Sequence, residues 1–97
     1  MSELDKILLK LKKHKTALNR KFKIKSMGVF GSYSRGEQRK TSDVDVLIEF
    51  IDPPGLLGYV SLENELSRYI GKKVDLVMRS ALKPRIGQQI LREVVYI

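Results

Sequence analysis

The sequence predicts a small α/β fold of the α+β type, in which a mixed β-sheet is flanked by helices. Segments with the apolar period of helices alternate along the chain with short runs rich in β-branched residues. The 97 residues contain no repeat, linker or low-complexity stretch, and this length suits one domain with a modest core. We therefore expect residues 1–97 to form a single domain with helices packed on the sheet.

The N-terminal part is expected to form a helix followed by a strand. Residues 3–20 carry apolar side chains at helical spacing, namely Leu4, Ile7, Leu8, Leu11 and Leu18. Ser2 and the acidic residues directly after it are typical of a helix N-terminus. Residues 24–30 (IKSMGVF) have the composition of a short strand, and residues 33–38 are expected to begin a short helix after a Gly-Ser turn.

The remainder predicts two further strand–helix pairs and a short last strand. Residues 44–50 (VDVLIEF) are typical of a strand. The next helix is expected at 56–70, because Pro-Pro-Gly precedes it and a glycine follows as its cap. A third strand is expected at 73–78 and a helix at 84–93, with a proline in its first turn. The ending VVYI is a candidate final strand.

Composition excludes several classes of protein. The chain has no cysteine, which rules out disulfides and thiolate metal sites. No apolar run approaches the roughly 20 residues that span a bilayer. The N-terminus, MSELDKILLK, is charged throughout and lacks the apolar segment of a signal peptide. We therefore expect a soluble cytoplasmic protein without a membrane partner.

The net charge of +8 comes largely from basic residues that precede the Gly-Ser pair. They are Lys10, Lys12, Lys13, Lys15, Arg20, Lys21, Lys23 and Lys25. One interpretation is a solvated helix face, and the other is attraction of nucleic acid or nucleotide phosphates. The sequence has neither interleaved aromatics for base stacking nor a finger or helix-turn-helix pattern, so nucleic acid is an alternative ligand that nothing here requires.

Asp43 and Asp45 lie two residues apart where the second strand begins. Strand side chains alternate, so both carboxylates are expected on one face, with Val44 and Val46 on the other. Adjacent ionised carboxylates repel unless one takes a proton or a cation intervenes. Mg²⁺ prefers oxygen ligands and often combines carboxylates with substrate phosphates. A solvent-facing strand edge with two ordinary acids is the alternative.

The pair Gly31-Ser32 stands between a predicted strand and a predicted short helix. Glycine permits close approach of a ligand to the backbone, and free N–H groups at a helix start bind phosphate. The Ser32 hydroxyl adds a donor. The alternative is a plain turn in which Ser32 caps the helix.

Asp75 interrupts an apolar strand, between Val74 and Leu76. One interpretation is a salt bridge to a neighbouring lysine. The other makes Asp75 a third carboxylate that joins Asp43 and Asp45.

Taken together, these motifs resemble the signature of the DNA polymerase β-type nucleotidyltransferase superfamily. The matching residues are FGS (30–32), RG (35–36) and SDVD (42–45), with a ten-residue spacer between Gly-Ser and Asp-x-Asp. The short length, KVDLV (73–77) and the ending EVVY (93–96) are most similar to the minimal nucleotidyltransferases. The resemblance spans residues 22–96 and implies a sheet like that of the polymerase β palm.

By that resemblance, Gly31 and Ser32 hold the β- and γ-phosphates of a nucleoside triphosphate, with ATP as the expected substrate. Arg35 is the candidate to support the phosphates, and a surface ion pair is an equally open interpretation of it.

The same resemblance makes Asp43 and Asp45 ligands of Mg²⁺ and Asp75 the third ligand, with a role in deprotonating the attacking hydroxyl. A pair of metal ions roughly 3.5–4 Å apart suits nucleotidyl transfer, because it activates the nucleophile and neutralises the leaving pyrophosphate.

The chain has room only for a catalytic core, so the acceptor is expected on a partner protein. Minimal nucleotidyltransferases commonly accompany HEPN-domain toxins as antitoxins, which implies AMP transfer to a toxin tyrosine. The alternatives are a non-catalytic antitoxin that covers the toxin and a nucleic-acid-binding accessory domain. Either a homo-oligomer or a hetero-oligomer is compatible with the sequence.

Overall fold

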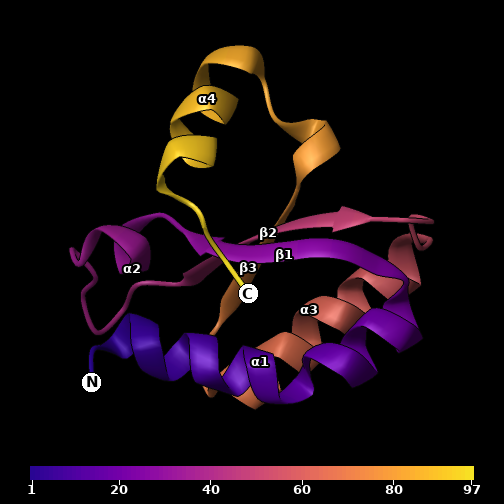
Figure 1. The fold of residues 1–97 in the computed structure, drawn as a ribbon, viewed down its shortest axis with the longest axis horizontal. Helices are drawn as coiled ribbons and strands as arrows, with labels where there is room; N and C mark the ends of the chain where they lie inside the picture. Colours follow the sequence, from indigo (N-terminus) through magenta and orange to yellow (C-terminus); the bar gives the residue numbers. More distant parts are fainter.

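The computed structural model describes residues 1–97 and contains a four-stranded mixed sheet with helices on both faces (Figure 1). In chain order the elements are α1 (Glu3–Phe22), β1 (Ile24–Phe30), α2 (Ser32–Arg35), β2 (Val44–Phe50), α3 (Leu56–Ile70), β3 (Val74–Met78), the 3-10 helix η1 (Arg79–Ala81), α4 (Pro84–Glu93) and β4 (Val95–Tyr96). The strand order is β3-β2-β1-β4. β1 is antiparallel to both β2 and β4, whereas β2 and β3 are parallel. The predicted α+β fold is therefore confirmed.

Local signals explain where the first helices begin and end. The Ser2 hydroxyl accepts the Asp5 N–H at 3.0 Å, and the Asp5 side chain returns to the Ser2 N–H, which forms a capping box at the start of α1. α1 continues two residues beyond the predicted end at 20, to the buried Phe22. The helix expected at 33–38 is shorter, because Gly36 adopts a left-handed conformation (φ 71°) and ends α2 at Arg35.

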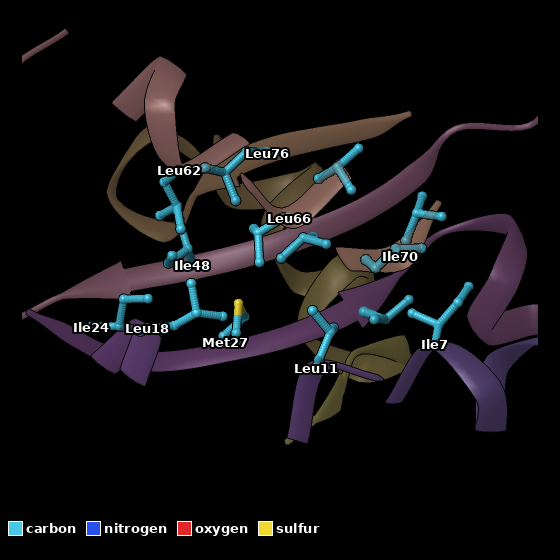
Figure 2. Close-up of a cluster of buried hydrophobic side chains, with 14 of the residues drawn as sticks. Ile7, Leu11, Leu18, Ile24, Met27, Ile48, Leu62, Leu66, Ile70 and Leu76 are labelled. Carbon is cyan, nitrogen blue, oxygen red and sulfur yellow. The ribbon is translucent and has the colours of Figure 1, made fainter. Parts of the chain in front are cut away.

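The main core lies between the sheet and the pair α1 and α3. It is a cluster of 17 buried residues from these helices and from β1, β2 and β3. Figure 2 shows side chains such as Leu11 and Leu66 meeting Met27 and Ile48 of the sheet. Burial of such side chains contributes roughly 1.5–3 kcal/mol each relative to exposure. None of the helices combines the length and the apolar character needed to cross a bilayer.

The opposite face of the sheet is covered by α4 and by the short helix η1 (Figure 1). Its buried cluster is small and consists of Phe30, Leu47 and Ile90. Gly28 permits the chain after α4 to cross β1, because a Cβ there would stand 2.7 Å from Val94 Cγ2. This second face carries the candidate functional residues.

Candidate functional site

The candidate site lies at the edge of the sheet where β1 ends and where β2 and β3 begin. Asp45 is paired in register with Phe30 of β1 on one side and with Asp75 of β3 on the other. Residues opposite one another in a ladder point to the same face, so Asp45 and Asp75 lie side by side on the α4 face. Asp43 shares their parity, because the intervening Val44 is fully buried on the opposite face. The structure thus brings the predicted carboxylates to one edge.

The electrostatics of this edge are dominated by negative charge around Asp45. Partial burial raises the pKa of the Asp45 carboxyl, and the charges of Asp75 and Asp43 raise it further. Arg35 opposes the shift, while Glu93 adds to it. The two nearby cations, Arg35 and Lys73, pair with Glu93 and with Asp43, so no cation is paired directly with Asp45.

No group of three or more His, Asp or Glu side chains stands close enough to form a ready-made metal cluster. The expected triad is thus not closed in this structure. The Asp43 carboxylate lies 4.0 Å from Lys73 Nζ, a loose ion pair between exposed side chains. The donor set still fits a hard divalent cation, since it offers carboxylate oxygens that repel one another and leaves positions for substrate phosphates.

Asp75 does not form the salt bridge that was its alternative interpretation. It is exposed on the edge strand β3, and the neighbouring Lys73 pairs with Asp43 instead. An exposed carboxylate beside a partly buried one leaves the outer side of the site accessible.

Gly31 approaches Asp45 so closely that no other residue fits at this position. Its backbone angles (φ 78°, ψ −150°) fall in a region adopted almost only by glycine. A Cβ would collide with the Asp45 carboxylate, whose Cγ would lie 3.1 Å away. Gly31 is also the N-cap of α2 and no side chain caps this helix, so the interpretation of Ser32 as an N-cap is wrong. Ser32 is the first residue of α2 and is partly buried.

Arg35 binds a carboxylate that the sequence analysis did not assign to the site. Its Nη1 lies 3.0 Å from both carboxylate oxygens of Glu93, and its Nε lies 3.5 Å from Glu37. Glu93 Oε1 also accepts the Gly31 N–H at 3.2 Å. The ion-pair interpretation of Arg35 is thus confirmed. Glu93 is the last residue of α4, where the helix dipole disfavours an acid, and that position is the signal in the sequence that could have indicated a specific role.

Comparisons with known proteins identify the family and the fold of this chain. Residues 11–97 match the family described as nucleotidyltransferase domain. The chain is 46% identical over 97 residues to the protein adenylyltransferase MntA of Thermococcus cleftensis, a match that covers all of this chain and 98% of that relative.

Two solved structures share the fold. One, assigned provisionally as a minimal nucleotidyltransferase, superposes with a TM-score of 0.79 at 33% identity and covers 98% of this chain and 95% of that one. The other is a chain from a toxin–antitoxin crystal structure with AMP-PNP, with a TM-score of 0.70 at 26% identity over 87% of this chain and 69% of that one.

Proposed function

Because this chain belongs to the nucleotidyltransferase domain family, we propose that it is a protein adenylyltransferase that acts as an antitoxin. It transfers AMP from ATP to a tyrosine hydroxyl of a cognate HEPN-domain toxin, and this modification neutralises the toxin. The observation that carries the proposal is the pairing of Asp45 with Asp75 on parallel strands, directly beside the glycine-only turn at Gly31. The name of the 46% identical relative and the AMP-PNP in the toxin–antitoxin structure support the choice of reaction and nucleotide.

In this proposal the turn after β1 receives the triphosphate. The absence of a side chain at Gly31 lets phosphate oxygens approach the backbone next to Asp45. The Ser32 hydroxyl donates to the same phosphates, and Arg35 supplies positive charge at the end of α2. ATP is thus held with its α-phosphate toward the acids.

Asp43, Asp45 and Asp75 would hold Mg²⁺, a pair of ions being the expected number. When bound, these ions polarise the attacking hydroxyl and neutralise the departing pyrophosphate. Asp75 lies on the exposed side of the acids, where it can accept the proton of an incoming hydroxyl.

The acceptor reaches the site from outside this chain. β3 is an edge strand of the sheet, and Asp75 on it is exposed. A partner surface therefore has to present the tyrosine hydroxyl. This arrangement predicts slow turnover of ATP by the isolated protein and transfer only when the partner is present.

The test is incubation of the protein with its cognate HEPN partner, Mg²⁺ and labelled ATP, followed by mass spectrometry of the partner. We expect AMP on a partner tyrosine. The rate of transfer should fall at least ~10³-fold for Asp43→Ala/Asp45→Ala, because the variant lacks ligands for the ions that neutralise the leaving pyrophosphate. Asp52→Ala is the matched control, since Asp52 is an exposed acid that pairs only with Lys23 at 3.5 Å.

A second candidate function is neutralisation by covering the toxin. If the double variant protects cells from the toxin as well as the unmodified protein does, occlusion replaces catalysis as the mechanism.

A further inference from the structure

Glu93 holds a position that the triphosphate also needs. Its Oε1 accepts the Gly31 N–H at 3.2 Å, and both of its oxygens lie 3.0 Å from Arg35 Nη1. The Glu93 side chain is only 17% exposed, so these contacts are partly shielded from water. A backbone N–H and a guanidinium that converge on one small anion form a recognition pattern that suits phosphate as well as carboxylate.

The single Gly31 N–H cannot donate fully to both anions at once, and a phosphate beside Arg35 would compete with Glu93 for the same guanidinium. We propose that Glu93 is an internal surrogate for a nucleotide phosphate: its carboxylate holds Gly31 and Arg35 in the ligand-free protein, and a phosphate group of the incoming triphosphate displaces it. This inference rests on the proposed function, since it concerns the same nucleotide site. Glu93 thereby sets the nucleotide affinity of the protein without contacting the bound nucleotide.

The surroundings of Glu93 favour such an exchange. It ends α4, where the negative end of the helix dipole opposes its charge. Ile90 is the one member of the small buried cluster that α4 supplies, but Val95 and Tyr96 pair with β1 shortly after Glu93, so the exchange requires rotation of the Glu93 side chain and no movement of the helix end. Once a phosphate stands beside Arg35, like charge repels the carboxylate from the turn.

The need to displace Glu93 reduces the apparent affinity of the protein for nucleotide. Only the fraction of molecules in which Glu93 has left the Gly31 N–H can bind phosphate there. Neutralising the side chain should therefore tighten binding. Glu93→Gln keeps an oxygen that accepts the Gly31 N–H but removes the charge that pairs with Arg35. We expect roughly tenfold tighter binding of Mg–ATP, the difference between a charge-assisted and a neutral hydrogen bond. The affinity for inorganic tripolyphosphate should rise by the same factor, because this probe offers the phosphates without the adenine ring.

Glu37→Gln is the matched control. It removes the same charge from the other carboxylate beside Arg35, 3.5 Å from Nε, but Glu37 makes no contact with Gly31. Calorimetric titration of the three proteins should show a change of less than twofold for Glu37→Gln. If Glu93 has only a structural role, Glu93→Gln binds both probes equally well or more weakly than the unmodified protein, and the inference is overturned while the proposed function stands.

If neither the folded unmodified protein nor folded Glu93→Gln binds either probe, the proposed function itself fails, and the inference fails with it. A structure of the unmodified protein with Mg²⁺ and a non-hydrolysable ATP analogue tests the inference without any substitution. A phosphate oxygen in place of Glu93 at the Gly31 N–H supports it, and an intact Gly31–Glu93 hydrogen bond beside bound nucleotide overturns it.

Discussion

The two faces of the sheet differ in what they bury and in what they expose. The face toward α1 and α3 packs against a cluster of 17 buried residues, which includes Val44 and Val46 at 0% exposure. The face toward α4 has three buried residues and carries Asp45 and Asp75 at its edge. Successive residues of β2 serve the two faces in turn, so one strand supports both the core and the site.

The difference indicates that stability and chemistry are divided between the faces. The α1/α3 face has no charged member in its core, whereas the α4 face keeps like charges together at a cost. Substitutions on the first face should therefore reduce stability, and substitutions on the second should alter nucleotide chemistry with small effects on folding.

The largest stability effect is expected from Leu66→Ala in α3. Leu66 is fully buried in the main cluster, so its truncation should cost about 2–5 kcal/mol of unfolding free energy. Ile90→Ala on the other face should cost about 2 kcal/mol or less, because α4 is lightly packed and can relax into the space. Urea denaturation of both variants measures the contrast. Equal losses would show that the α4 face contributes to stability as much as the main core does.

Gly31→Ala should damage both folding and activity. Alanine at φ 78°, ψ −150° costs about 1–3 kcal/mol, and its Cβ displaces the Asp45 carboxylate. We expect a lower melting temperature together with at least ~10²-fold slower AMP transfer, because a small misplacement of a catalytic group is costly. Gly36→Ala, at the other end of α2, is the control: its φ of 71° is also strained, but a Cβ there meets no atom within 4 Å. Loss of activity in Gly36→Ala equal to that in Gly31→Ala would mean that backbone strain alone accounts for the effect.

Ser32→Ala should separate phosphate binding from folding. Since Gly31 is the N-cap, the Ser32 hydroxyl does not cap α2, and we expect a stability change within about 0.5 kcal/mol. Loss of one hydrogen bond to a charged phosphate should weaken Mg–ATP binding by about 1.5–3 kcal/mol, as titration calorimetry would record. Ser34→Ala, which loses a bond to the Gly31 carbonyl at 3.0 Å, controls for disturbance of the turn. Unchanged affinity in Ser32→Ala would remove Ser32 from the site.

The smallest effect, and the only one of opposite sign, is expected for Asp45→Asn in metal-free protein. Partial burial and the two neighbouring aspartates raise the pKa of Asp45 in the folded state. The folded chain therefore binds this proton more tightly than the unfolded chain, so the group adds stability as the pH falls through the raised pKa and loses it as the pH rises. At neutral pH the free energy of unfolding of Asp45→Asn should equal that of the unmodified protein or exceed it by up to ~1 kcal/mol.

Thermal melts in the presence of chelator, run from neutral pH downward, check this prediction. The stability advantage of Asp45→Asn over the unmodified protein should shrink as the pH is lowered. A clear loss of stability in Asp45→Asn at neutral pH would instead identify Asp45 as a structural acid.

Much of the fold could be predicted because its boundaries carry local signals. The bounds of α3 and α4 match the predictions, since glycines flank α3 and a proline begins α4. The strand expected at 73–78 begins one residue later, at Val74. The strand order and the parallel pairing of β2 with β3 could not be derived, because they depend on contacts between distant segments.

The candidate site, like the fold, could be predicted only in part. Asp43 and Asp45 were identifiable from their spacing, and the structure places Asp75 beside Asp45. The contact of Glu93 with Gly31 joins residues 62 positions apart, so no local period predicts it. The ion pair between Lys73 and Asp43 joins residues from separate segments, so it too depends on the folded chain.

The position of Asp75 in β3 also affects how accurately β3 pairs with β2 during folding. The side-chain period of a strand is two, so a slip of one residue would turn Asp75 toward α1 and α3, in place of the buried Val74 or Leu76. An unpaired carboxylate in that core would cost far more than the hydrophobic contacts it replaced. Asp75 therefore disfavours the shifted register of β3. The same shifted register would separate Asp75 from Asp45 and so destroy the site.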